Sequence, residues 1–189
     1  MATIDILCVI DTNGLMKRAK DTGTLSTPIN LAAVDASTDT FVFMICDGQY
    51  ACNNQGKSEL MINANVGDTV RWTITDPSTG LTPGEDSKSF SCILYNFKSG
   101  GEGTVLTTPV LNSAPAISYY NSLTSITTPV AAAYMCSSWN SSIVATGNIQ
   151  YDWAFQVVDN ATGEVVGYYT WDPYINVKKA PVTSMAETV

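Results

Sequence analysis

An aromatic stretch near the C-terminal end, residues 167–177, constrains the fold more than any other part of the chain. Four aromatic residues fall within it, and the Asp172-Pro173 step interrupts them. Tyr, Trp, Thr, Ile and Val suit a pleated, half-buried surface, so both sides of the step are predicted to be strands. Because proline has no N–H to donate to a ladder, the step marks a bend, an edge or a strand start. We expect the two strands to form a final hairpin that closes a sandwich.

Alternation of apolar and polar residues predicts three more strands of the core. Residues 58–66 and 69–75 alternate on either side of a Gly-Asp turn, so we interpret them as a hairpin. Residues 148–158 alternate in the same way. The pattern places Trp72 and Trp153 on the side of each strand that faces the core.

The remaining segments complete an all-β pattern. Further strands are predicted at residues 3–11, 40–46 and 90–97, a short helix at 13–18 and a long loop over 20–40. Residues 104–129 contain three prolines and have no period, while 131–139 fit either a strand or a helical turn. About seven short strands separated by turns predict a single-domain antiparallel β-sandwich of jelly-roll or immunoglobulin-like type, with little helix. The sandwich is expected over residues 1–177, with a C-terminal tail at 178–189.

The charge balance and the apolar runs limit the possible partners. The chain has 189 residues and a formal net charge of −8, which disfavours binding to nucleic acid or to an anionic membrane. The first apolar run is interrupted by Asp5, and no run approaches the length of a membrane span. We therefore expect a cytoplasmic protein with reduced cysteines, in which Cys46 and Cys52 pair only under oxidising conditions.

The residue types also limit the chemistry. The chain contains no histidine, which removes the commonest general base and the usual nucleophilic triads. No phosphate-binding glycine motif is present. A paired-carboxylate hydrolase remains an alternative if acidic residues meet in space, and the candidates are Asp47, Asp152, Glu164 and Asp172. Carboxylates at strand ends are more often turn caps, so we predict no enzyme activity, no catalytic residue and no cofactor.

Trp139 is the strongest candidate for a ligand-binding residue. It lies among small polar residues and is followed by Asn140, so its ring is able to stack on a sugar while amides and hydroxyls bind the rim. The alternative is that Trp139 closes one end of the sandwich and its indole N–H binds a carbonyl oxygen. Asp47, Trp171 and Asp172 are the other candidates for a ligand site.

Carboxylates in predicted loops raise the further alternative of calcium binding. They are Asp35, Asp39, Asp47, Asp76, Glu85, Asp86 and Asp172. Calcium prefers such oxygen ligands, but the spacing is not that of an EF-hand loop. Solvated loop carboxylates are the simpler interpretation, so no metal site is predicted.

The order of several segments resembles the PixA/AidA family, the inclusion body proteins of Gram-negative bacteria. The matching segments are residues 4–12, 43–47, 65–72, 93–95 and 167–175, of which the Gly-Tyr-x-x-Trp-Asp-Pro motif beginning at Gly167 is the most telling. Cys8 and Cys46 stand where relatives are expected to carry aliphatic or small residues. The resemblance implies a non-catalytic protein that is made in quantity and accumulates as cytoplasmic inclusions. It carries over no catalytic residues.

Two functions of different kinds follow from the sequence. The first is a structural or storage protein that associates with itself as a homo-oligomer or ordered assembly, as low charge density and the family resemblance suggest. The second is a lectin-like module that binds glycans through Trp139 and the C-terminal aromatic residues. Neither requires a nucleic acid or a membrane as partner.

Overall fold

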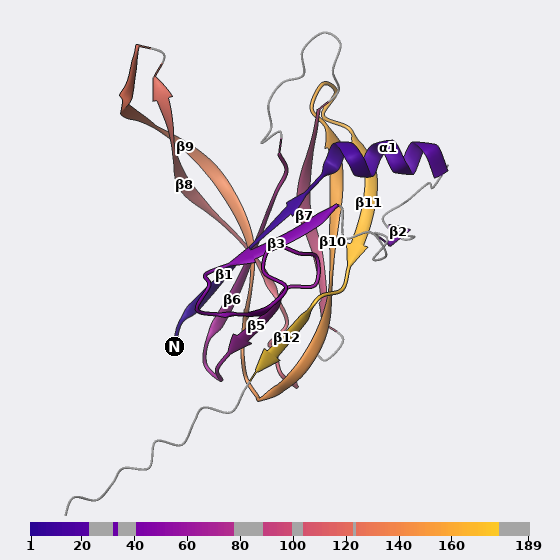
Figure 1. Ribbon diagram of the computed structural model, residues 1–189, viewed down its shortest axis with the longest axis vertical. Helices are drawn as coiled ribbons and strands as arrows, with labels where there is room; N and C mark the ends of the chain where they lie inside the picture. The colour runs from indigo at the N-terminus through magenta and orange to yellow at the C-terminus, as the bar shows by residue number, and fades with distance from the viewer. Residues whose placement is uncertain (23–31, 34–40, 78–88, 100–103, 123, 178–189) are drawn as a thin grey trace, which may run out of the picture.

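The structure, a computed structural model, describes residues 1–22, 32–33, 41–77, 89–99, 104–122 and 124–177 (Figure 1). The predicted tail at 178–189 and most of the predicted loop at 20–40 lie outside these residues. Two β-sheets enclose one apolar core, which confirms the all-β sandwich. Among the described residues, no helix is both long and apolar enough to span a membrane.

The first sheet has five strands in the order β3-β1-β6-β9-β8. Their bounds are β1 Thr3–Ile10, β3 Val42–Cys46, β6 Thr69–Thr75, β8 Val110–Ser122 and β9 Ser125–Ser142. Strand β8 lies at one edge of this sheet, and β9 extends well beyond the four residues through which it pairs with β6.

The second sheet has seven strands, with β10 at its centre. Their bounds are β2 Ala32–Ala33, β4 Ala51–Asn53, β5 Met61–Ala64, β7 Phe90–Ser99, β10 Gly147–Asp159, β11 Val165–Trp171 and β12 Tyr174–Val177. Six strands follow the order β2-β11-β10-β12-β5-β4, and β7 pairs with β10. The sheets are mixed rather than purely antiparallel, because β1 with β6, β2 with β11 and β5 with β12 are parallel.

The predicted hairpin of residues 58–66 and 69–75 is wrong. Strand β5 belongs to the seven-stranded sheet and β6 to the five-stranded sheet, so the turn between them crosses from one layer to the other. The Asp68 carboxylate fixes this turn by accepting hydrogen bonds from the N–H groups of Ala2 (2.7 Å) and Asn65 (2.9 Å). Alternation reports that one face of a strand is buried, and it carries no information about which sheet the strand joins.

The predicted C-terminal hairpin is also wrong. Strands β11 and β12 do not pair with each other, since both pair antiparallel with β10, in one register from Val157 opposite Gly167 to Gly147 opposite Val177. The Asp172-Pro173 step is a break inside one long strand. The turn that reverses the chain lies between β10 and β11.

Helix α1 (Thr12–Thr22) follows β1 and is longer than the sequence predicts. It begins where the side chain of Asp11 accepts a hydrogen bond from the N–H of Gly14 (2.9 Å), which satisfies one of the free donors of the first turn. Leu15 anchors the helix to the core.

The core contains the tryptophans that alternation predicts to be buried. Trp72 is 0% exposed and Trp153 1% exposed. The five cysteines are free; Cys46 is buried and Cys52 exposed.

Candidate functional site: an exposed hairpin and the hollows at its base

The hairpin of β8 and β9 projects from the sandwich as an arm (Figure 1). We use this name for β8 together with residues 125–138 of β9. The two strands pair from Val110 opposite Asn140 to Ser122 opposite Ser125. Beyond Trp139, β9 pairs only with β8 among the described residues, so the outer part of the arm has no neighbouring strand. Nearly every residue of β8 is exposed.

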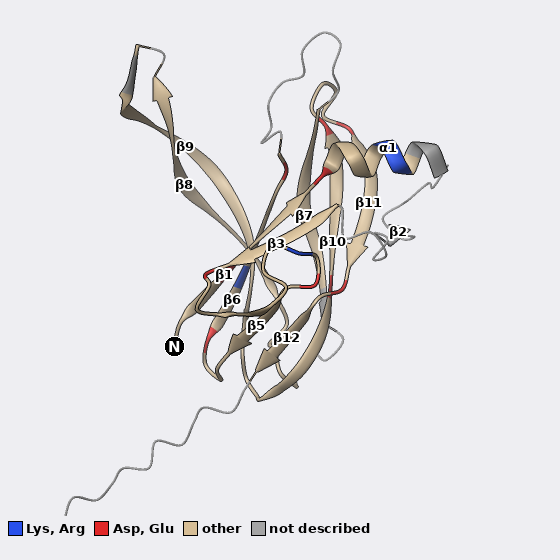
Figure 2. Ribbon diagram, viewed as in Figure 1, with Lys and Arg blue, Asp and Glu red and all other residues tan. Residues whose placement is uncertain are grey.

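The arm lies within a charge-free part of the sequence. No Asp, Glu, Lys or Arg occurs from Gly103 to Tyr151, although the whole chain carries a net charge of −8. Figure 2 shows the described part of the arm entirely without charged residues. Edge strands of soluble proteins are usually protected by charged side chains, and lysine is the commonest of them. This hairpin is exposed without that protection.

One face of the arm is largely apolar, although Ser113, Asn121 and Ser137 also lie on it. Directly opposite residues in an antiparallel pair lie on the same face, and the register therefore places Ile117 with Ala133 and Tyr119 with Ala131. We call this face the open apolar face; its outer part consists of Pro115, Ile117, Tyr119, Ala131, Ala133 and Met135. Ile117 is 62% exposed, Tyr119 68% and Met135 64%.

The open apolar face is the continuation of a face that is buried further down the same sheet. Trp72 and Trp139 are opposite each other on β6 and β9, and both point toward the other sheet. Trp139 is half-buried, stacks on Phe97 with ring centroids 6.4 Å apart, and donates its indole N–H to the Leu94 carbonyl (3.1 Å). Trp139 is thus the last covered residue of the inward face of β9, and the inward positions beyond it are exposed.

The other face of the arm turns toward the body of the protein. Together with the outer face of β1 and β6 it borders a groove of about 710 Å³. The groove contains the ion pair between Asp5 and Arg71, whose Nε–H donates to the carboxylate at 2.6 Å. Both side chains remain well exposed, at 61% and 46%. The pair is solvated and leaves no free charge aimed at a ligand.

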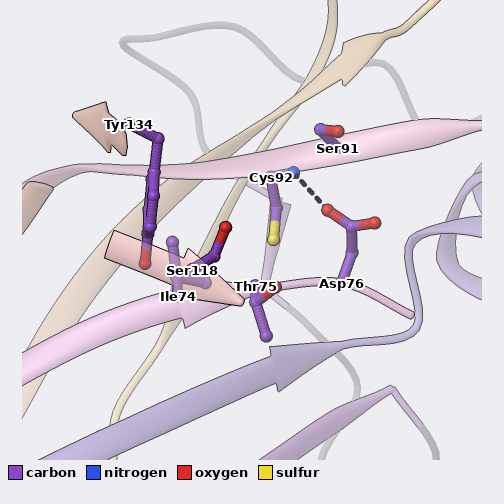
Figure 3. Close-up of a pocket in the computed structure, with 7 residues that line it drawn as sticks. All are labelled: Ile74, Thr75, Asp76, Ser91, Cys92, Ser118 and Tyr134. Carbon is purple, nitrogen blue, oxygen red and sulfur yellow. Dashed lines mark hydrogen bonds between the residues drawn. The ribbon is translucent and has the colours of Figure 1, made fainter. Parts of the chain in front are cut away.

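A second hollow of about 660 Å³ lies where the arm diverges from the ends of β6 and β7 (Figure 3). Ser118 and Tyr134 line it from the arm, and Asp76 and Cys92 line it from the body. The buried Asp76 carboxylate accepts a hydrogen bond from the Cys92 N–H (3.3 Å). Burial, with a smaller contribution from Asp76, raises the pKa of the Cys92 thiol well above its usual range. The thiol is therefore protonated at neutral pH and is a poor nucleophile.

Trp139 and Asn140, the strongest sequence-predicted ligand residues, lie at the base of the arm. The Trp139 indole N–H binds a carbonyl oxygen, as the alternative interpretation of this residue predicts. The Asn140 side-chain oxygen accepts a hydrogen bond from Ser138 (3.2 Å). Asp47 lies after β3, at the opposite edge of the same sheet, where its carboxylate accepts a hydrogen bond from the Gln49 N–H (3.0 Å).

Trp171 and Asp172 lie in the other sheet. Trp171 is 3% exposed and donates its indole N–H to the Ser58 carbonyl at 2.8 Å. The Asp172 carboxylate accepts a hydrogen bond from the Gln150 side chain at 2.6 Å. The structure therefore brings Trp139 and Asn140 together and leaves the other candidates apart from them. None of the five lines either hollow.

The carboxylates considered for calcium binding are spread over several segments. Asp35, Asp39, Glu85 and Asp86 lie outside the described residues. Within the part of the chain that the structure describes, no three His, Cys, Asp or Glu side chains are grouped closely enough to hold a metal ion.

These features define a class of protein. It is a single-domain, all-β sandwich that exposes an uncharged, largely apolar hairpin. Sequence reasoning did not find this hairpin; the long run without any charge was the signal that would have pointed to it.

Comparison with known proteins identifies the family of the chain. The family model described as PixA, inclusion body protein, matches residues 2–177. The chain belongs to the PixA family of inclusion body proteins, as its ordered motifs predict.

Among solved structures, the chain is similar to the crystal structure of an inclusion body protein of the PixA family from Burkholderia cenocepacia J2315. The TM-score is 0.73 at 18% sequence identity, and the match covers 94% of this chain and 96% of that one. At this identity the likeness supports the fold. No curated protein sequence matches the chain.

Proposed function

We propose that this protein is a non-catalytic inclusion body protein, which associates with itself in the folded state and accumulates as inclusions in the bacterial cytoplasm. The observation that carries the proposal is the arm, which exposes large apolar side chains on a well-formed hairpin without any charge. Monomeric soluble proteins rarely expose a contiguous apolar patch of this kind, and such patches usually mark an interaction site. Membership of the PixA inclusion body family supports the same conclusion.

The chemistry of the described residues supports a role without catalysis. The chain has no histidine. The thiols of Cys8 and Cys92 are buried, and burial raises both pKa values, so neither is a thiolate at neutral pH. The hollows at the base of the arm contain one solvated ion pair and one carboxylate already bonded to the backbone, and neither arrangement activates a water or a nucleophile.

The test is the size distribution of the purified, folded protein from micromolar to millimolar concentration, measured by light scattering with near-UV circular dichroism as a check of tertiary packing. We expect particles larger than the 20.2 kDa monomer that grow with concentration and keep the aromatic dichroism of the folded state. A protein that remains monomeric at millimolar concentration would contradict the proposal. So would particles that form only after the dichroism is lost.

A further inference from the structure

The open apolar face lacks a covering layer for a structural reason. Along β9 the inward face carries Trp139 over the aromatic core, and the next apolar position on that face is Met135, which is 64% exposed. The strand and its register with β8 are unchanged, but beyond Trp139 the arm diverges from β6 and from the opposite sheet (Figure 1). A face of this composition is normally one half of a sandwich layer, and its missing half is another sheet about 10 Å away.

The charges of the chain indicate what kind of molecule covers it. A nucleic acid or an acidic partner requires basic residues, and the arm has none. Two copies of a chain with net charge −8 repel each other over most of their surface, and the repulsion is smallest where charges are absent. The arm is therefore the part of the surface on which a second copy docks with the least electrostatic cost.

The size of the face is sufficient for such a contact. Strand β8 has 13 residues, so the arm is about 40 Å long at roughly 3.4 Å per residue. With a width of about 10 Å the face has a footprint of roughly 400 Å² per copy, so two faces together bury about 800 Å². This is below the roughly 1,000 Å² of a stable specific interface, so the contact is a weak and reversible one.

The proline in β8 favours contact through the face over pairing through the strand edge. Pro115 lies in the middle of β8, the edge strand of its sheet, and has no N–H to donate to an added strand. Pairing of two β8 edges would lose a ladder hydrogen bond there in each copy. In a contact between two open apolar faces, by contrast, Pro115 adds apolar surface and no hydrogen bond is lost.

We propose that two copies pack the open apolar faces of their arms against each other across a two-fold axis near Ile117. This inference rests on the self-association put forward above and names the surface that performs it. A two-fold contact closes after two copies, so growth of an inclusion uses at least one further contact.

The experiment compares two variants that carry the same number of new charges on the same two strands. Ile117→Asp with Met135→Asp places charges on the open apolar face, and Ser118→Asp with Tyr134→Asp places them at the matching diagonal positions of the opposite face. Sedimentation velocity of the full chain over a concentration series gives the dimer dissociation constant, and thermal unfolding checks that each variant is folded. We expect the first variant to raise the dissociation constant by about 100-fold or more, because each charge enters the contact twice. The control is expected to associate like the wild type.

The possible results separate the two proposals. If the wild type associates and the Ile117 and Met135 variant associates equally well, the open apolar face is not the contact, although self-association stands. If the control dissociates as strongly, the contact is not confined to this face and the inference is overturned. A wild type that does not associate overturns both. Should the aspartates prevent folding, Ile117→Thr with Met135→Gln keeps the strand and removes apolar surface, and it is expected to weaken association in the same order.

Discussion

The inward face of β9 has a lower half, at Trp139, and an upper half, along the arm. Both halves belong to the same strand, keep the same register with β8 and carry no charge, yet their environments are opposite. In the lower half, Trp139 stacks on Phe97 beneath the second sheet. In the upper half, Met135 and its neighbours on β8 are exposed. The difference lies in the cover and not in the residues of the strand. A largely apolar sheet face that no second layer covers is a surface on which another molecule can pack. If so, substitutions in the covered half should change the stability of the monomer, and substitutions in the exposed half should change association.

The largest expected effect is loss of a core aromatic. Trp72→Ala removes a fully buried ring that packs 4.6 Å from Phe97 and 5.3 Å from Tyr151, between ring centroids. We expect the free energy of unfolding to fall by about 3–5 kcal/mol. Ile117→Ala on the arm is the matched exposed substitution, with an expected change within about 0.5 kcal/mol for the monomer. Urea unfolding of dilute protein measures the free energy of unfolding of both variants. Equal losses of stability would show that the covered and exposed halves of the β9 face do not differ.

High pH tests the buried half without mutation. Burial raises the pKa of the Cys8 thiol and of the Tyr151 phenol well above their usual ranges. The folded state therefore holds these protons more tightly than the unfolded state, and the associated stability is present at neutral pH. It is lost as the pH rises above the ordinary thiol and phenol pKa values of 9.0 and 10.0. Urea unfolding between pH 7 and 11 should show a steep decline that is shallower in Cys8→Ala, and an identical slope in the variant would refute this explanation.

A smaller effect is expected from a single core hydrogen bond. The Trp72 indole N–H donates to the Tyr151 hydroxyl at 3.0 Å, and both groups are buried. Tyr151→Phe keeps the ring stack on Phe97 and leaves this donor unsatisfied, which costs about 1–3 kcal/mol. Thermal unfolding measures the loss. A variant as stable as the wild type would show that the donor finds another acceptor.

The smallest effect is expected in the groove beside the arm. The side chains of Asp5 and Arg71 are 61% and 46% exposed, and Asp5→Asn removes the ion pair between them. Exposed pairs contribute about 0–1 kcal/mol and are screened by salt, so the difference from the wild type should vanish at high ionic strength. A loss that exceeds 2 kcal/mol, or that salt does not reduce, would mean that the groove is more tightly structured than its exposure implies.

The strands of the core could be predicted because each buries one face. Alternation placed Trp72 and Trp153 correctly, and the Asp-Pro step correctly interrupted a strand. Alternation did not reveal how strands are partnered, which is why the two expected hairpins, at the Gly67 turn and at Pro173, are instead a crossing between sheets and a break within one strand.

The arm could not be predicted in the same way, because it buries neither face within one copy. Residues 104–129 therefore show no period, and short edge strands there could not be placed from the sequence. The candidate ligand residue Trp139 was recognised as unusual for a related reason, since it stands at the boundary where the covered part of β9 ends. Glycan binding through Trp139 stays a prediction, and a glycan array with the wild type and Trp139→Ala tests it.

The most direct test of the contact between arms is cross-linking at its proposed axis. Ile117→Cys and Ser118→Cys, each made with Cys52 and Cys136 replaced by serine, place one thiol on either face of the same strand. A short bis-maleimide is added at a concentration where the protein associates. Because facing sheets lie about 10 Å apart, Ile117→Cys should yield covalent dimers and Ser118→Cys should not. Equal cross-linking of both variants, or of neither while the protein is associated, would contradict the claim that the open apolar face joins two copies.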